Sequence, residues 1–148
     1  MYRTLVVILL SGILSHGLAQ DVPKGEKDAP KRVVLMIGDG MGLSQLTVPY
    51  YYDVEEPVFD RFPYVGLVKT SSATAPVTQS PAAATAMATG HKTYNMAVGV
   101  DRDTIPRSNL VEILSHAGFK TGIIATSSIT DATPAGFYAH QPDRSLHY

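Results

Sequence analysis

A serine at the start of a helix of small residues is the feature of this sequence that bears most directly on chemistry. Ser80 is followed by Pro81 and then by alanines and threonines up to Gly90. Serine often caps a helix, and proline is favoured at the first helical position. Free N–H groups and the helix dipole favour an anion there. Two interpretations stay open: Ser80 is a plain helix cap, or it is a nucleophile at the base of a small anion site.

Asp39 could hold a metal ion. It lies in the glycine-rich turn 38–42, directly after an apolar run, from which its side chain could reach a metal. The alternative is a turn in which the aspartate bonds its own backbone. A dinucleotide loop is disfavoured, because the glycine spacing differs from G-x-G-x-x-G and a carboxylate would repel a pyrophosphate.

Three polar residues near the C-terminal end suggest oxyanion or magnesium chemistry. Asp131 and Thr133 could offer a carboxylate and a hydroxyl to Mg²⁺, or could cap a helix that begins at Pro134. Arg144 carries a planar fork suited to phosphate, although an isolated arginine is usually a solvated surface residue. The five histidines show no metal-ligand spacing, and there is no cysteine to form a disulfide or a thiolate site.

The elements that must position these residues alternate along the chain. Apolar runs at 32–37, 65–70 and 120–127 predict buried strands. The sequence predicts an α/β fold, a mostly parallel sheet with helices on both faces. Its ligands would lie beyond the C-terminal ends of the strands, so Asp39, Ser80 and Asp131 should converge. Helices are predicted over 44–52 with a break at Pro49, over 80–88, and over 133–140. A further helix is predicted over 109–117, with Ser108 or Asn109 as its cap and with Leu110, Ile113, Leu114 and Ala117 on one apolar face.

Composition and the N-terminal segment limit the classes of protein to which this chain could belong. A net charge of -1 over 148 residues favours neither nucleic-acid binding nor disorder. Arg3, the apolar run 5–14 and the small residues Gly17 and Ala19 predict a signal peptide over 1–19. Residues 20–31 predict a flexible leader, and 32–148 the folded part. We expect an exported protein, periplasmic or extracellular, with no nucleic-acid partner and no membrane attachment after cleavage.

Taken together, several motifs resemble the alkaline phosphatase family in their order and spacing. The resemblance implies an α/β domain, of which this chain is the N-terminal part, and hydrolysis of small phosphate monoesters through a phosphoserine. It also implies two Zn²⁺ and one Mg²⁺ in the complete enzyme, which could be a homodimer. The matching segments are 36–42, 77–80, 82–95, 97–101, 131–135, and Ala139-His140 followed by Arg144.

The resemblance also implies a role for each residue. Asp39 would be shared between a zinc and the magnesium. Ser80 would be the nucleophile and a zinc ligand, because zinc makes a serine hydroxyl reactive. Asp131, directly or through water, and Thr133 would bind the magnesium. Arg144 would clamp two phosphate oxygens and stabilise the charge that spreads over them during transfer.

The chain departs from the family pattern in three ways. Gln79 stands where the family has an aspartate that helps to hold the arginine, so we expect looser phosphate binding. Pro81 removes an N–H near the phosphate. The family's remaining zinc ligands lie downstream of Arg144, so we expect this chain alone to be poorly soluble and inactive. The alternatives are a related phosphodiesterase or sulfatase, against which the stretch 89–95 argues, and a non-catalytic secreted domain that binds anions.

Overall fold

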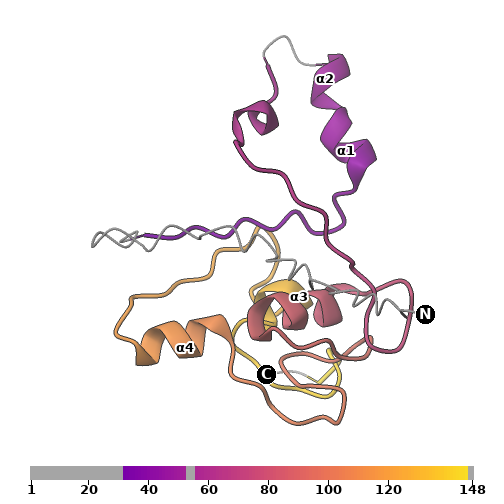
Figure 1. Cartoon of the computed structure of the whole chain (residues 1–148). Helices are drawn as coiled ribbons and strands as arrows, with labels where there is room; N and C mark the ends of the chain where they lie inside the picture. The colour runs from indigo at the N-terminus through magenta and orange to yellow at the C-terminus, as the bar shows by residue number, and fades with distance from the viewer. Residues whose placement is uncertain (1–31, 53–55, 147–148) are drawn as a thin grey trace, which may run out of the picture. The chain divides into compact units, whose positions relative to one another are not determined.

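A computed structural model of the protein describes residues 32–52 and 56–146. The predicted signal peptide and leader lie outside the described residues. The chain divides into a first unit that ends at Met36 and a second unit from Ile37 to Tyr148. The described part of the first unit, 32–36, is extended and its side chains are exposed. Every helix described below belongs to the second unit (Figure 1).

Helices provide the regular structure of the second unit. Where the sequence predicts one helix broken at Pro49, two short helices form and Val48 lies between them. This confirms the predicted break, because proline removes a backbone donor and clashes with the preceding turn. The elements in order are α1 (Leu43–Thr47), α2 (Pro49–Tyr52), the 3-10 helix η1 (Val58–Arg61), α3 (Ser80–Thr89), α4 (Leu110–His116) and α5 (Ala132–Ala135).

Helix α3 confirms the helix predicted after Ser80, with one correction at its start. Gln79, and not Ser80, occupies the N-cap position, and Ser80 is the first helical residue. The reason is that the Gln79 carbonyl accepts the first helical hydrogen bond, from the N–H of Ala83 at 3.0 Å. Pro81 then falls in the first turn, where a missing N–H costs nothing. Gly90 ends the helix with φ of 74°, a left-handed conformation suited to glycine.

Helix α4 has the predicted cap but not the predicted buried face. The Asn109 side chain accepts from the N–H of Glu112, and the Glu112 carboxylate accepts from the N–H of Asn109, which completes a capping box. Val111 packs against the core. The residues predicted to share an apolar face are instead exposed: Leu110, Ile113, Leu114 and Ala117.

Helix α5 begins earlier and ends sooner than the predicted helix over 133–140. It starts at Ala132, so Pro134 is its third residue. Beyond Ala135 the chain continues as tight turns, in which Phe137 and Tyr138 donate to carbonyls three residues back. The small residue Gly136 allows this tightening beside α3.

The predicted parallel sheet is not confirmed. Within 32–52 and 56–146, paired extended backbone is limited to two isolated antiparallel bridges, Val98 with Gln141 and Val100 with Pro106. Leu67 and Ile124, in two of the runs predicted as buried strands, are fully exposed. A strand is stable only where neighbouring strands pair with its N–H and C=O groups, and the described residues supply none to these runs. Residues 32–36 of the first run are likewise exposed, so the predicted burial is not confirmed there either.

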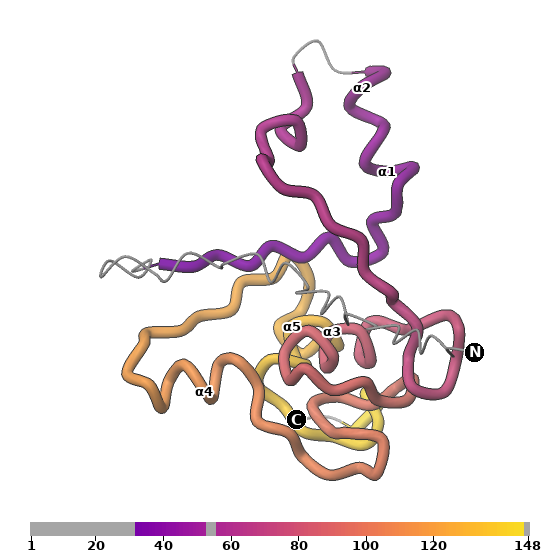
Figure 2. The backbone as a smooth tube through the Cα atoms, in the orientation of Figure 1, coloured from indigo at the N-terminus to yellow at the C-terminus, as the bar shows by residue number. Residues whose placement is uncertain are grey.

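The core lies between α3 and α5, which run side by side (Figure 2). Ala84 and Ala88 of α3 pack against Phe137, with Ile37 and Ile123 at the margin. The approach is so close that a Cβ on Gly136 would lie 2.7 Å from the Cβ of Ala84. Small residues on both sides therefore fix the spacing of the two helices.

The segment 97–101 is a second buried layer against α3. The Thr85 hydroxyl accepts from the N–H of Gly99 at 2.8 Å and donates to the Ala97 carbonyl at 3.3 Å. Gly99 has a φ of 61°, and a Cβ there would meet the Ala139 carbonyl oxygen at 1.9 Å, so only glycine fits. Across the described part of the chain, no helix has the length and apolar character needed to cross a membrane.

Candidate active site

Asp39 joins two hydroxyl groups that are far apart in the sequence. The Ser80 Oγ donates to Asp39 Oδ1 at 3.0 Å, and the Thr133 Oγ1 donates to Asp39 Oδ2 at 2.6 Å. Asp39 lies in a tight turn closed by a bond from the N–H of Met41 to the Gly38 carbonyl, and Gly40 adopts a φ of 69° within it. The turn presents both carboxylate oxygens to the hydroxyls, one to each.

Packing of α3 against α5 holds the two hydroxyls in place. Ser80 is the first residue of α3, and Thr133 is the second residue of α5. The close contact between Gly136 and Ala84 ties the helices together about one turn from each hydroxyl. The structure thus brings together three of the five predicted site residues: Asp39, Ser80 and Thr133.

The structure does not join the other two predicted residues to this cluster. Asp131 occupies the N-cap position of α5, but its side chain makes no capping hydrogen bond and is exposed. Arg144 is held through its backbone, whose N–H donates to the Met96 carbonyl at 2.8 Å. Within the described residues, no hydrogen bond or ion pair links its guanidinium to Asp39 or Ser80.

Asn95 is a residue of this region to which the sequence analysis assigns no role. Its Oδ1 accepts from the N–H of Gln79 at 3.1 Å, and its Nδ2 donates to the Val77 carbonyl at 3.1 Å. One side-chain amide therefore holds the loop immediately before Ser80. Its place in the matching segment 82–95 was the available signal, but the pairing spans sixteen or more residues and no local pattern predicts it.

A charged pair holds the segment that follows α5. His140 Nε2 lies 2.8 Å from Glu112 Oε1, and its Nδ1 lies 2.7 Å from the Gly99 carbonyl oxygen. Both ring nitrogens face acceptors, which favours the doubly protonated imidazolium. Burial lowers the pKa of His140, but its bonds to Glu112 and to the Gly99 carbonyl outweigh burial and raise it. The bond from His140 lowers the pKa of Glu112.

The donor atoms around Asp39 fit a hard cation better than zinc. One carboxylate and two hydroxyls are oxygen ligands of the kind that Mg²⁺ takes. Zinc sites usually use three or four nitrogen, sulfur or carboxylate ligands. In the segments that the structure describes, no three His, Cys, Asp or Glu side chains are grouped to hold a metal. These residues therefore fit part of a magnesium site and do not by themselves complete a zinc site.

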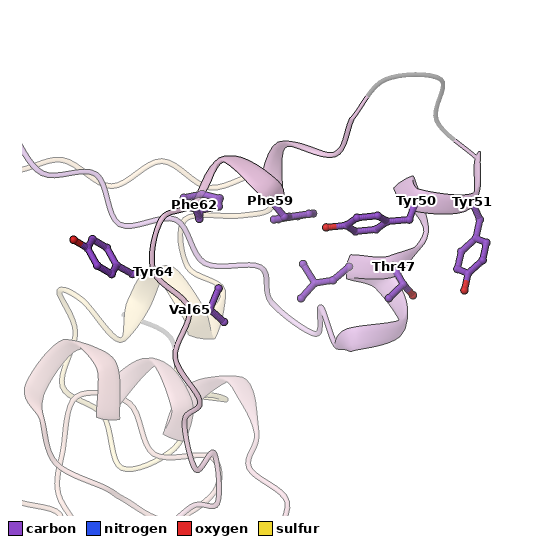
Figure 3. A pocket seen from close by; sticks show the side chains of 8 residues that line it. Thr47, Tyr50, Tyr51, Phe59, Phe62, Tyr64 and Val65 are labelled. Atoms are coloured by element: carbon purple, nitrogen blue, oxygen red, sulfur yellow. The ribbon is translucent and has the colours of Figure 1, made fainter.

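A pocket of about 640 Å³ lies away from this cluster, in the segment 46–65. Aromatic side chains dominate its lining, and Figure 3 shows the Tyr50 hydroxyl directed toward Phe59. The Tyr50 hydroxyl donates to Asp60 Oδ1 at 2.6 Å, and this bond raises the pKa of Tyr50. None of the five predicted site residues lines it. The lining residues are Leu46, Thr47, Tyr50, Tyr51, Phe59, Phe62, Tyr64 and Val65.

The carboxylate of Asp39 thus joins the hydroxyl of Ser80, at the start of α3, to the hydroxyl of Thr133. A family model described as alkaline phosphatase matches residues 30–147. The chain belongs to the alkaline phosphatase family.

Relatives over most of the chain agree with this assignment. Alkaline phosphatase 3 of Bacillus subtilis is 41% identical over 145 residues, which cover 92% of this chain and 31% of that protein. Alkaline phosphatase of Schizosaccharomyces pombe is 36% identical over 150 residues, covering 96% of this chain and 28% of that protein. The chain thus spans about a third of the length of the curated relatives it matches.

Solved structures give the same answer for the fold. The alkaline phosphatase from the Antarctic bacterium TAB5 matches with a TM-score of 0.76 and 48% identity, over 78% of this chain and 34% of that one. A histidine-to-aspartate variant of the TAB5 enzyme, with Mg bound in its M3 site, matches with a TM-score of 0.77 and 50% identity, over 79% and 34% of the two chains. The fold is therefore alkaline-phosphatase-like, as the sequence predicts.

Proposed function

We propose that the complete protein hydrolyses phosphate monoesters through a phosphoserine on Ser80. The observation that carries this proposal is the Ser80–Asp39–Thr133 cluster at the start of α3, in a chain of the alkaline phosphatase family. Ser80 Oγ attacks phosphorus and the alcohol leaves with a proton. Water then attacks the phosphoserine, which releases phosphate and restores the serine hydroxyl. Asp39 orients Ser80, since its Oδ1 accepts the hydroxyl proton in a hydrogen bond.

Asp131 and Arg144 complete the proposed site. Asp131 and Thr133 would hold a magnesium together with Asp39. Asp39 and Ser80 would contribute to a zinc whose other ligands are not among the five site residues. When bound, such metals lower the pKa of a hydroxyl and offset phosphate charge. Arg144 would clamp the phosphate oxygens. Its backbone bond to Met96, next to Asn95, supports this placement, because Asn95 holds the loop before Ser80.

The experiment is an assay of the full-length gene product, with zinc and magnesium supplied, on 4-nitrophenyl phosphate, a bis-ester of phosphate and a sulfate ester. Ser80→Ala should lower monoester turnover by about 10⁶-fold, since loss of a nucleophilic serine costs about that much. Ser108→Ala serves as the matched control, because Ser108 is exposed and lies outside the proposed site. Transfer of labelled phosphate to Ser80 would confirm the intermediate.

Other outcomes of that assay would refute the proposal. Faster hydrolysis of the diester or the sulfate ester would assign the chain to a related activity. Phosphate binding without turnover and without metal dependence would make it an anion-binding domain.

We propose in addition that the runs 32–37, 65–70 and 120–127 form parallel strands in the complete protein. Their exposed apolar side chains support this, as does the small share of the relatives that the chain spans. Leu67→Ser should then lower the unfolding free energy of the full-length protein by about 2–5 kcal/mol, the cost of emptying a core position, yet leave this chain's stability unchanged. Equal effects in both proteins would refute the sheet.

The N-terminal segment supports export to the periplasm or the exterior as a further proposal. Mass analysis of secreted protein that begins at Gln20 would agree with cleavage after Ala19, and an intact Met1 in that material would not. A homodimer of the complete enzyme is also proposed on the family resemblance alone, and sedimentation of the full-length product tests it.

A further inference from the structure

Tyr94, Asn95 and Met96 link the loop immediately before Ser80, called here the serine loop, to the loop that carries Arg144, called the arginine loop. The Asn95 amide accepts from the N–H of Gln79 and donates to the Val77 carbonyl, both at 3.1 Å. The Tyr94 hydroxyl donates to the Pro142 carbonyl at 2.8 Å. The Met96 carbonyl accepts from the N–H of Arg144 at 2.8 Å. One side of this segment is thus bonded to the serine loop and the other to the arginine loop.

The backbone of this segment is held in a conformation that its residues do not favour. Met96 has a φ of 78°, in the left-handed region that residues other than glycine, asparagine and aspartate rarely adopt. Such a conformation persists only where surrounding contacts determine it, and it is commonly found at functional sites. Here the bonds of Asn95 on one side and of Met96 on the other supply those contacts.

The same segment is fixed to the rest of the fold. Ala73 donates to the Thr93 carbonyl at 2.8 Å, which docks the serine loop at a second point. Val98 and Gln141 exchange two backbone hydrogen bonds, at 2.9 and 2.8 Å, which docks the arginine loop at a second point. Each loop is therefore joined to the segment 93–98 by both backbone and side-chain bonds, so a shift of this segment would move both loops.

We propose that Tyr94, Asn95 and Met96 are positioning residues that set the distance between the Ser80 hydroxyl and the Arg144 guanidinium. The inference rests on the proposed function, in which the serine attacks phosphorus and the arginine holds the phosphate oxygens. It assigns separate effects to the two side chains. Asn95 sets the position of the nucleophile, and Tyr94 sets the position of the arginine loop.

Steady-state kinetics of the full-length protein on 4-nitrophenyl phosphate separate these effects. Asn95→Ala should lower kcat by about 10- to 100-fold, the cost of displacing a reacting group by up to about 1 Å, with a smaller change in KM. Tyr94→Phe removes one hydroxyl and should raise KM and the inhibition constant of inorganic phosphate several-fold while kcat changes less. Asn95→Asp keeps the acceptor for Gln79 and should recover part of kcat.

Tyr64→Phe is the matched control, because Tyr64 is 90% exposed and its hydroxyl has no described bond. Kinetics of Asn95→Ala and Tyr94→Phe equal to that control would overturn the inference. A loss of kcat that merely follows a loss of Tm, and disappears at lower temperature, would also overturn it, because that result describes a structural role alone.

Amide hydrogen exchange separates this inference from the proposed function. Asn95→Ala should speed exchange at the Gln79 N–H, and Tyr94→Phe should speed it at the Arg144 N–H, each by at least several-fold. If the wild-type protein lacks phosphatase activity, the proposed function fails and the exchange pattern alone decides the positioning role. Unchanged exchange at both amides would overturn it.

Discussion

Gly136→Ala tests whether the contact between α3 and α5 positions the site. An added Cβ would lie 2.7 Å from the Ala84 Cβ, 3.1 Å from the Ala84 carbonyl carbon and 3.2 Å from the Thr85 nitrogen. Carbon atoms pack best at about 3.5–4.0 Å, so the helices must separate by about 1 Å. Inserting a methyl into a packed core costs about 1–3 kcal/mol. Because Ser80 begins α3 and Thr133 lies on α5, the same shift should move one hydroxyl from Asp39.

Urea unfolding and phosphatase kinetics of the same variants, made in the full-length protein, measure both consequences. We expect Gly136→Ala to lose about 1–3 kcal/mol of unfolding free energy and about 10- to 100-fold in kcat. Ala84→Gly should cost about 1 kcal/mol by itself, as glycine does inside a helix. The double variant should regain most of kcat while staying about 1 kcal/mol less stable than wild type, since the glycine cost remains.

Ser108→Ala is the matched control, because Ser108 is exposed and lies outside the runs proposed as strands. It should change stability by no more than about 0.5 kcal/mol, as surface substitutions usually do. If Gly136→Ala matched this control in both stability and kcat, the helix contact would not position the site. If stability fell but kcat did not, packing would be confirmed and its link to Ser80 refuted.

Three further changes test the caps and the charged pair. Asn109→Ala removes the cap of α4 and should lower the unfolding free energy by about 1 kcal/mol in urea titrations, whereas Ser108→Ala should not. The pair of Glu112 and His140 should stabilise the protein most between pH 4.5 and 6.5: its contribution is lost as pH rises through the raised pKa of His140 or falls through the lowered pKa of Glu112. The difference in Tm between wild type and Glu112→Gln, followed from pH 4 to 9, checks this, and a pH-independent difference would contradict it. Gln79→Asp should stabilise α3 by about 0.5–1 kcal/mol and strengthen phosphate inhibition, and unchanged inhibition would refute the assumed effect of Gln79.

The features that the sequence predicts correctly depend on neighbouring residues. The break before Pro49, the end of α3 at Gly90 and the cap at Asn109 each follow from one residue's backbone or side-chain preference. The strands depend on partners elsewhere in the chain. An apolar run such as 65–70 has the pattern of a strand, yet without a hydrogen-bonded neighbour its side chains stay exposed.

The site residues also differ in whether neighbouring residues or distant contacts determine their positions. Ser80 is the first residue of α3 and Thr133 the second residue of α5, and a local signal predicts a helix near each. The positions of Tyr94, Asn95 and Met96 depend on bonds to two distant loops and on a left-handed φ at a methionine. Bonds to distant loops leave no signature in the local sequence. The left-handed φ of Met96 leaves none either, because methionine ordinarily avoids that conformation.

Convergence of Asp39, Ser80 and Asp131 was predicted from a sheet that the described residues do not form. Asp39 instead meets Ser80 and Thr133, so another force must bring these three together. Small residues in α3 and at the C-terminal end of α5 supply it. Ala84 and Gly136 let the helices meet at a distance that larger side chains forbid, and this contact places both helix starts beside one turn. The alanine-rich run after Ser80 therefore serves the site through packing as much as through the helix dipole, and a larger residue at position 84 should disturb Asp39 even where Ser80 is intact.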